Sequence, residues 1–398
     1  MKILMLTPYV PYPPSSGGQI RTLNLLKYLS RNNQITLVAL YKNNKEKEYF
    51  SYLKAYCRNI YLCQRPEKPW TLKNICNSIF SLSPFLVVRN YSEEAKATIN
   101  KLLQEEKYDV IHAETFYIMP HIPKTHVPIL LVEQTIEYKV YQHFVNSIFF
   151  LFRPLLSIDI LKLKYWERFY WRKANLVATV SESDQEIIND LEPNNETTVI
   201  PNGAGDEMIV AKLKEKNFAE PTILFQGNFF WLQNVEAALF LINNIYPLLK
   251  KSIPNITVII SGQNAKKIQI EKSIHLKIID NQPDDQDLVK KYFQEATVFI
   301  APIFGPGGTR LKILAAMASG TPVISTKIGL EGLDIIDNQN ALIANTAPEF
   351  AEKITSILNN KKQYEEIRAN AYQLIRKKYN WKEISEKLEK VYRSIGKK

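Results

Sequence analysis

The sequence predicts an α/β protein with two Rossmann-like domains, each a doubly wound parallel β-sheet flanked by helices. Three observations support this prediction. The chain has 398 residues, which is more than one hydrophobic core usually holds. Short apolar runs alternate with amphipathic stretches from the first residue onward, as expected for repeated βαβ units. The same alternation starts again after a polar segment in the middle of the chain, residues 206–221.

In the first half, short apolar strands are expected to alternate with amphipathic helices. One helix is expected from Gly18 or Gln19 to Arg31, and another from Glu93 to Glu106. A last short strand is expected within residues 197–203. The other expected strands are Lys2–Leu6, Gln34–Tyr41, Asn59–Leu62, Val110–Ala113, Ile129–Val132 and Leu176–Val180.

The second half repeats this order. A long helix is expected over Asn234–Lys251, a charged helix over Lys361–Lys377, and a last helix over Trp381–Ile395. The expected strands are Thr222–Phe225, Ile256–Ser261, His275–Ile279, Thr297–Ala301 and Pro322–Ser325. We therefore expect domains at residues 1–205 and 206–375, with a C-terminal helix at 376–398 that packs back toward the first domain.

The charge balance favours an anionic partner. Lysine and arginine number 51 against 40 acidic residues, a formal net charge of +11. Nucleotide phosphates, a negatively charged membrane face and nucleic acid all fit this excess, but nucleic acid is the least favoured because no basic stripe or reading motif is present. The three cysteines predict neither a disulfide framework nor a zinc site. The short apolar start predicts a strand rather than a signal peptide, so a cytoplasmic protein is expected.

The most informative segment, residues 301–325, reads as strand, glycine loop, helix, glycine stop and strand. A helix expected over Thr309–Ala318 would carry two basic residues in its first turn. Basic residues there oppose the helix dipole unless an anion binds them, so the pattern favours phosphate binding over the alternative, a plain turn with solvated side chains. The candidate anion-binding residues are Gly307, Gly308, Thr309, Arg310 and Lys312.

The first βα turn is a second candidate. Prolines lead into Gly17 and Gly18, which open the first helix and would let backbone N–H groups touch a diphosphate or a sugar. The pattern is weak by itself, because it lacks the spacing of a dinucleotide-binding fingerprint and such turns are common.

Together, these motifs resemble the glycosyltransferases of the GT-B fold, specifically the retaining glycosyltransferase family 4. The resemblance covers nearly the whole chain. It implies two Rossmann-like domains that face a cleft, and transfer from a nucleotide-diphosphate sugar with retained configuration, without a required metal or cofactor. The segments that carry it are Met1–Arg21, Asp109–His112, Val180–Asp184, Ile200–Gly203, Phe225–Trp231 with Asn234 and Val235, and Pro302–Gly332.

The resemblance also implies where the two substrates bind. The second domain would hold the nucleotide and diphosphate, and the first would offer the acceptor, a glycan or lipid-linked glycan used in surface polysaccharide synthesis. His112 and Gln134 are the expected acceptor-binding residues. Glu114, Glu133 and Glu137 could bind acceptor hydroxyls or take the proton of the attacking one, and Glu114 and Glu137 are the predicted catalytic residues. For each carboxylate the alternative is a cap or a surface charge.

Some departures from the family pattern keep other functions open. Gly307 and Ala315 stand where the family has two glutamates, and Gln134 and Thr135 replace a frequent His-Asn pair. A degenerate GT-B protein that binds sugar or a partner without catalysis is therefore the alternative, and a nucleotide-sugar epimerase is a third hypothesis that no residue favours. The Asp285-Gln286-Asp287 triplet resembles a metal motif of another fold, but it is expected to cap a helix.

The segment Phe144–Trp171 mixes aromatic, aliphatic and basic residues. It predicts either an amphipathic surface in peripheral contact with the inner membrane face, or helices of the core.

Overall fold

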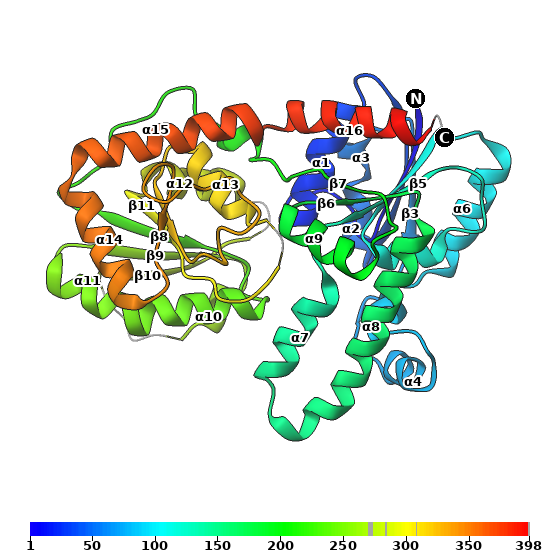
Figure 1. Cartoon of the computed structure of the whole chain (residues 1–398), viewed down its shortest axis with the longest axis horizontal. Helices are drawn as coiled ribbons and strands as arrows, with labels where there is room; N and C mark the ends of the chain where they lie inside the picture. Colours follow the sequence, from blue (N-terminus) through cyan, green and yellow to red (C-terminus); the bar gives the residue numbers. More distant parts are fainter. Residues whose placement is uncertain (270–273, 283–284, 308, 397–398) are drawn as a thin grey trace. The chain divides into compact units, whose positions relative to one another are not determined.

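The computed structural model describes residues 1–269, 274–282, 285–307 and 309–396, so Gly308 lies outside the described residues. The chain divides into two compact units. The first unit comprises Met1–Pro201 and Ile384–Lys398, and the second comprises Asn202–Glu383. Each unit is built on a parallel β-sheet flanked by helices (Figure 1). The predicted α/β class with two Rossmann-like domains is confirmed.

The first unit contains a seven-stranded sheet in the order β3-β2-β1-β4-β5-β6-β7. All neighbouring strands run parallel. The central strands are buried on both faces, which explains why they read as unbroken apolar runs in the sequence. The strands are β1 (Lys2–Thr7), β2 (Gln34–Tyr41), β3 (Asn59–Gln64), β4 (Val110–Glu114), β5 (Ile129–Glu133), β6 (Leu176–Thr179) and β7 (Thr197–Val199).

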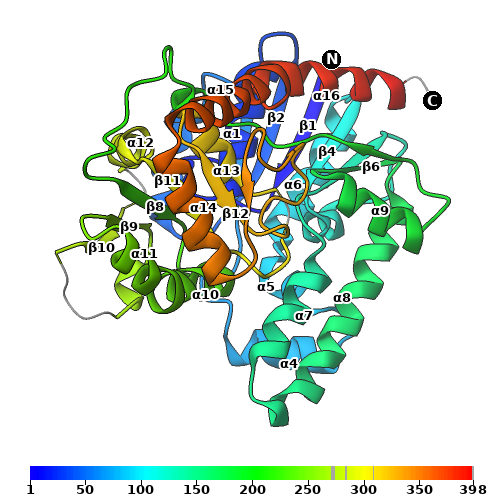
Figure 2. The ribbon, with the colours of Figure 1, turned by 60° about the vertical axis from the view of Figure 1, so that its left-hand side comes forward.

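Helices cover this sheet, and one helical hairpin extends away from it. Several helices begin at a side-chain cap of the expected kind, such as Ser92 and Ser181. The hairpin consists of α7 and α8, with α4 beside α8 (Figures 1 and 2). The helices are α1 (Gly17–Leu29), α2 (Asn44–Glu48), α3 (Phe50–Leu53), α4 (Leu72–Phe80), α5 (Phe85–Asn90), α6 (Glu93–Glu105), the short η1 (Phe116–His121), α7 (Glu137–Ser147), the short η2 (Phe150–Phe152), α8 (Arg153–Lys173) and α9 (Glu182–Leu191).

The C-terminal helix α16 (Trp381–Ile395) starts in the second unit and continues into the first, because the division falls at Ile384. Ile384, Leu388 and Tyr392 follow one another at intervals of four residues, which places them on one face of the helix, and all three are buried. Asn32 and Asn33 of the first unit donate hydrogen bonds to Glu389 of this helix, at 3.3 and 2.8 Å.

The second unit contains a six-stranded parallel sheet in the order β10-β9-β8-β11-β12-β13. Its strands are β8 (Thr222–Gln226), β9 (Thr257–Gly262), β10 (Leu276–Asp280), β11 (Val298–Ala301), β12 (Val323–Ser325) and β13 (Leu342–Ile343). Its helices are the short η3 (Asp206–Met208), α10 (Leu232–Phe240), the π-helical η4 (Leu241–Ile245), α11 (Tyr246–Ser252), the short η5 (Ala265–Lys267), α12 (Gln286–Glu295), α13 (Leu311–Ala318), α14 (Ala347–Asn359) and α15 (Lys361–Lys378).

Two helices of this unit differ from the prediction. The expected helix Asn234–Lys251 is divided by the π-helical η4 just before Pro247, whose ring nitrogen cannot donate the bond that a regular helix requires. The helix expected from Thr309 begins instead at Leu311, and Arg310 is its N-cap with an extended backbone. Arg310 therefore precedes the first turn rather than lying in it. The triplet at Asp285 opens α12, as predicted, with Asp285 at the N-cap position and Asp287 in the first turn. The Asp285 side chain accepts a hydrogen bond from the Gln282 N–H and none from the described residues of the helix.

Candidate active site

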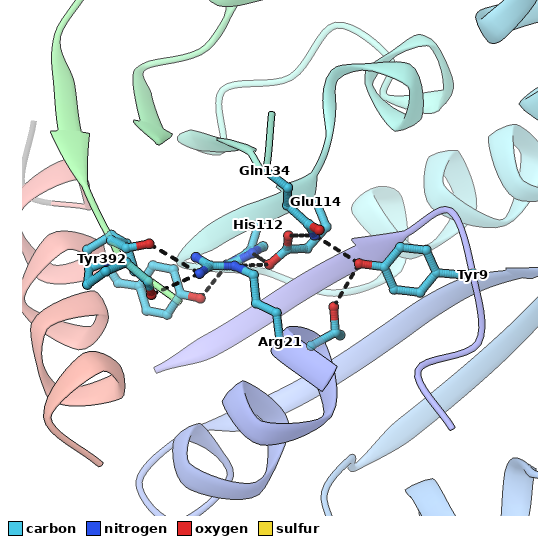
Figure 3. A network of polar contacts seen from close by, with 9 residues as sticks. Tyr9, Arg21, His112, Glu114, Gln134 and Tyr392 are labelled. Carbon is cyan, nitrogen blue, oxygen red and sulfur yellow. Dashed lines mark hydrogen bonds and ion pairs between the residues drawn. The ribbon is translucent and has the colours of Figure 1, made fainter. Parts of the chain in front are cut away.

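A buried polar network lies at the carboxyl ends of the central strands of the first unit (Figure 3). Glu114, the last residue of β4, is its centre. Its Oε1 accepts a hydrogen bond from His112 Nε2 at 2.9 Å and lies 3.5 Å from the guanidinium Nε of Arg21. Its Oε2 accepts from Gln134 Nε2 at 2.6 Å. Both carboxylate oxygens of Glu114 are thus engaged by side chains of the protein.

Glu114 and Arg21 have no exposed surface, so this charge pair is fully enclosed. Burial alone would raise the pKa of Glu114, but the charge of Arg21 and the hydrogen bonds from His112 and Gln134 lower it, and the pKa ends below its ordinary value. Arg21 also donates to the carbonyls of Ile200 and Pro201, both at 3.1 Å. Glu114 is therefore a buried carboxylate that holds α1, β4 and the end of the first unit's main segment together.

The same network reaches the C-terminal helix. His112 Nδ1 lies 2.5 Å from the hydroxyl oxygen of Tyr392, in α16, and both side chains are buried. Both ring nitrogens of His112 are therefore hydrogen-bonded inside the protein, one to α16 and one to Glu114. This arrangement fits a residue that positions its neighbours, and the acceptor-binding role of His112 stays a prediction.

Gln134 connects this network to the start of α1. Its amide Nε2 donates to Glu114 and to the Tyr9 hydroxyl, the latter at 2.9 Å, and the Tyr9 hydroxyl also pairs with Thr22 at 3.1 Å. Gly18 lies directly against the side chains of Tyr9 and Gln134. A Cβ atom at Gly18 would be 2.5 Å from the Tyr9 hydroxyl and 2.9 Å from Gln134 Oε1. A glycine is thus required at 18 for close packing, whereas the neighbouring Gly17 is exposed.

Substitution Gly18→Ala is expected to destabilise the first unit by about 1–3 kcal/mol, because Tyr9 and Gln134 must move to admit the methyl group. Urea unfolding followed by circular dichroism measures this change. Gly17→Ala is the matched control and should leave the free energy of unfolding unchanged or slightly raised. Equal effects of the two substitutions would contradict the packing role of Gly18.

Three more carboxylates lie at the base of the α7–α8 hairpin. Glu167 is buried and accepts hydrogen bonds from the backbone N–H groups of Glu137 and Tyr138, at 2.8 and 2.9 Å, so it caps α7 from the neighbouring helix. Glu133 is buried at the end of β5 and accepts from Trp171 Nε1 at 2.8 Å. Burial raises the pKa of Glu133 and of Glu167, and in Glu167 the charge of Glu133 adds to the rise.

Glu137, the first residue of α7, differs from these two because its side chain is only half-buried. Burial raises its pKa to about 7, while the charge of Arg89 acts in the opposite direction. A carboxyl with a pKa near neutrality can both accept and return a proton at physiological pH. Among the three predicted carboxylates, Glu137 is the one that combines partial exposure with this pKa.

In the second unit, Lys312 lies at the carboxyl end of β8. Its Nζ donates to Asn234 Oδ1 at 2.6 Å and stands 4.9 Å from the centre of the Phe225 ring. A Cβ atom at Gly227 would be 2.9 Å from this ammonium group, so the glycine makes room for it. Burial and the charge of Arg310 lower the pKa of Lys312 to about 7. With this pKa the lysine is only partly protonated at neutral pH, and an anion beside it would favour the charged ammonium form.

Arg310 stabilises the glycine loop itself. Its guanidinium donates to the carbonyl of Gly305 at 2.6 Å and to that of Gly307. Gly307 has a φ of +139°, a backbone conformation that favours glycine. A Cβ atom there would lie 2.8 Å from Arg310 Nη1 and 3.5 Å from the amide of Gln233. Thr309 is buried. The loop thus brings the predicted Gly307, Arg310 and Lys312 together.

Several residues of these two clusters were missed by the sequence prediction. Arg21 and Tyr9 flank the glycine pair, but nothing in a sequence shows that Arg21 is buried or that Tyr9 reaches residue 134. Tyr392 was predicted only as part of the last helix, Trp381–Ile395. Asn234 belongs to the residues that carry the family resemblance, and this was the one signal that pointed to it, whereas nothing in the sequence pointed to Gln233.

Sequence models of two families match consecutive parts of the chain. The model described as Glycosyltransferase Family 4 matches residues 15–207, and the model described as Glycosyl transferases group 1 matches residues 220–360. The chain is a GT-B glycosyltransferase that resembles family 4. The matches also support a nucleotide-sugar donor for this glycosyltransferase.

Solved structures share the fold of this glycosyltransferase at low sequence identity. Sucrose-phosphate synthase from Thermosynechococcus elongatus superposes with a TM-score of 0.73 at 16% identity, over 99% of this chain and 98% of the other. HepE from Anabaena, solved in complex with UDP-glucose, superposes with a TM-score of 0.64 at 13% identity, over 99% and 100% of the two chains.

Two curated relatives align along nearly their full length. A 44.6 kDa protein from a cps region of Klebsiella pneumoniae is 25% identical over 399 residues, covering 96% of this chain and 97% of the relative. An uncharacterized glycosyltransferase from Methanocaldococcus jannaschii is 23% identical over 405 residues, covering 100% and 99%. In the part of the glycosyltransferase that the structure describes, no helix is both long and apolar enough to span a bilayer.

Proposed function

We propose that the protein is a retaining glycosyltransferase that acts without a metal ion and moves a sugar from a nucleotide-diphosphate sugar to a glycan or lipid-linked acceptor during surface polysaccharide synthesis in the cytoplasm. The observation that carries this proposal is the cluster in the second unit, where a glycine loop, Arg310 and Lys312 meet at the carboxyl end of a parallel sheet. Ligands of open α/β sheets bind at this edge.

The diphosphate of the donor is the ligand that fits this cluster. When the bond between the sugar C1 and the diphosphate oxygen breaks, negative charge grows on the leaving diphosphate. Lys312 can hold that charge as an ammonium group, and Arg310 keeps the loop amides in position to donate to it. Interactions that strengthen as the charge develops lower the barrier to transfer.

The first unit supplies the acceptor side. We assign proton exchange with the attacking hydroxyl to Glu137, which is half-buried and has a pKa of about 7. As the acceptor oxygen bonds to C1, its proton passes to the Glu137 carboxylate, and the bond from C1 to the diphosphate oxygen breaks, so that the diphosphate leaves with the negative charge. Glu114 and His112 fit a positioning role, because Glu114 holds Gln134 next to Gly18 and His112 holds Glu114. Gly17 and Gly18 would offer the amides at the start of α1.

The relatives support the substrate classes. The structure of HepE was solved with UDP-glucose, which supports a nucleotide-sugar donor here. The Klebsiella pneumoniae relative is named for a cps region, which supports a role in surface polysaccharide synthesis.

The decisive experiment supplies the protein with a panel of nucleotide sugars and measures release of the nucleoside diphosphate with EDTA present and with a lipid extract as acceptor source. We expect release from one donor in the presence of EDTA, and nuclear magnetic resonance of the product should show the anomeric configuration of the donor. A product of the opposite configuration would overturn the retaining mechanism.

Thermal shift with free nucleoside diphosphates tests the alternative of a protein that binds without turnover. A ligand that binds only the folded state must raise the midpoint of unfolding. No shift with any nucleotide, together with no release of diphosphate, would favour the non-catalytic alternative.

A further inference from the structure

Exposed apolar side chains are concentrated on one part of the first unit. Among the described residues, more than half of the exposed large apolar side chains come from two segments, residues 70–82 and 144–165. Several are almost fully exposed: Leu72 by 82%, Phe80 by 87% and Leu82 by 84%. The others are Trp70, Ile79, Phe144, Phe149, Phe150, Leu151, Ile158, Leu161 and Tyr165. We call these twelve side chains the apolar patch. Clusters of this kind mark interaction sites.

The side chains of each helix share one face. On α4, Ile79 and Phe80 follow Leu72 by seven and eight residues, which places all three on the same side of the helix. On α8, Leu161 and Tyr165 follow Ile158 by three and seven residues, which places all three on one side of the helix. Residues on other faces of α8, such as Leu163 and Glu167, are buried instead. The exposed face is thus a stripe distinct from the one that packs on the protein.

Hydrogen bonds join α4 and α8 into one surface. Lys162 Nζ donates to the carbonyls of Ser78 and Ser81, both at 2.7 Å. The Asp159 carboxylate accepts from the Ser78 hydroxyl at 3.1 Å and from the Phe85 N–H at 2.9 Å. Figures 1 and 2 both show α4 beside α8, at the part of the hairpin far from the sheet. Half-buried and exposed polar contacts therefore join the two helices that carry half of the apolar patch.

The charges around the patch are arranged by sign. The acidic side chains of the hairpin are turned inward: Asp159 is bonded to the α4 region, Glu167 caps α7, and Glu137 is half-buried at the base. The basic side chains near the patch lie at or partly at the surface, and they are Lys68, Lys73, Lys139, Arg153 and Lys164. One acidic residue, Glu67, precedes α4 in the chain and is exposed. These five basic side chains, set against one exposed acidic residue, give the surface of the two segments an excess of positive charge, and we call them the basic rim.

We propose that the apolar patch and its basic rim dock on the surface of an anionic lipid bilayer. Aromatic and aliphatic side chains such as Trp70, Phe80 and Phe150 suit the boundary between headgroups and acyl chains, and lysines beside them attract anionic headgroups. None of the described helices is long and apolar enough to cross a bilayer, so we propose a contact with the bilayer surface only. Its use in bringing the enzyme to a lipid-linked acceptor rests on the proposed function, but the binding itself does not.

Vesicle flotation tests this proposal on the full chain. The purified protein is mixed with vesicles of phosphatidylglycerol and phosphatidylethanolamine, or of phosphatidylcholine alone. We expect the anionic vesicles to carry the protein and the neutral ones to carry far less, with the bound fraction falling as salt rises. The substitution set L72S, F80S, F150S and L151S should lower the partition coefficient by about tenfold or more, because the side chains that enter the bilayer are removed.

Ile274→Ser together with Ile336→Ser is the matched control, because these exposed apolar side chains of the second unit are 84% and 54% exposed and lie outside the patch. This control should bind anionic vesicles like the unchanged protein. Circular dichroism and the affinity for UDP should be the same in all variants, which separates a failure of this proposal from a failure of the proposed donor site. Equal flotation of the patch variant and the control would overturn the proposal. A different result would also overturn it: the protein does not float with vesicles, and light scattering shows a dimer that the patch substitutions dissociate.

Discussion

Affinity for a nucleoside diphosphate is expected to fall as the pH rises above about 7, and Lys312 is the expected cause. In the free protein, burial and the charge of Arg310 hold the pKa of Lys312 at about 7. A bound diphosphate stabilises the ammonium form and raises this pKa. Below pH 7 the lysine is already charged and binding needs no proton. Above pH 7 binding must take up a proton, so affinity should fall by up to roughly tenfold per pH unit.

Titration calorimetry with UDP between pH 6 and 9, in buffers of different ionisation enthalpy, measures both the affinity and the proton uptake. Lys312→Met should remove the pH dependence and weaken binding at pH 6 by roughly 10- to 100-fold, the worth of a hydrogen bond to a charged group. Lys277→Met is the control, because Lys277 is exposed on β10. A Lys312→Met protein that keeps the pH dependence would show that another group takes up the proton.

The second large effect is expected for Glu114→Ala, which should lower the free energy of unfolding by about 3–5 kcal/mol, because it leaves the fully buried Arg21 without its carboxylate. His112 and Gln134 would also lose their acceptor. Urea unfolding measures this loss, and Glu186→Ala, at an exposed position of α9, should change stability by less than about 0.5 kcal/mol.

The pH dependence of that stability follows from the lowered pKa of Glu114. The folded chain binds the proton of this carboxyl less readily than the unfolded chain, so the contribution is complete above the unfolded pKa. It is lost as the pH falls through the lower pKa of the folded state. The Glu114→Ala protein should therefore lose less stability on acidification than the unchanged protein. An equal loss in the two proteins would show that Glu114 is not the carboxylate that governs acid unfolding.

Much of the fold could be predicted because buried parallel strands leave a local signal. Strands such as β2 and β5 have apolar side chains on both faces, and a continuous apolar run between polar turns identifies them without knowledge of their neighbours. The two-residue β13 was missed, since so short a strand has no period of its own. The break at η4 and the start of α13 were also missed, because helix boundaries depend on contacts that side-chain periodicity does not record.

Some residues of the candidate site could likewise be predicted from the sequence, and others could not. Gly307, Arg310 and Lys312 are near one another in the chain, so a loop followed by a helix brings them together by local geometry. Asn234 is 78 residues away from Lys312, and only the pairing of strands in the sheet places it within hydrogen-bond distance. Glu114 illustrates the limit further. Its sequence position fits a catalytic residue, a cap or a surface charge, and only the fold shows that its carboxylate is buried against Arg21 and His112.

The sequence by itself determined the alternation of strands and helices, the two-domain α/β class and the glycine loop with its cations, because each depends on residues within about one helix or strand length of one another. Tertiary structure alone decided which charges are enclosed. Tyr392 meets His112 across 280 positions of the chain, and the pKa of Lys312 is lowered by surroundings that no spacing rule contains. The physical reason is that desolvation and ion pairing depend on distance in space, which the fold sets and the order of residues does not.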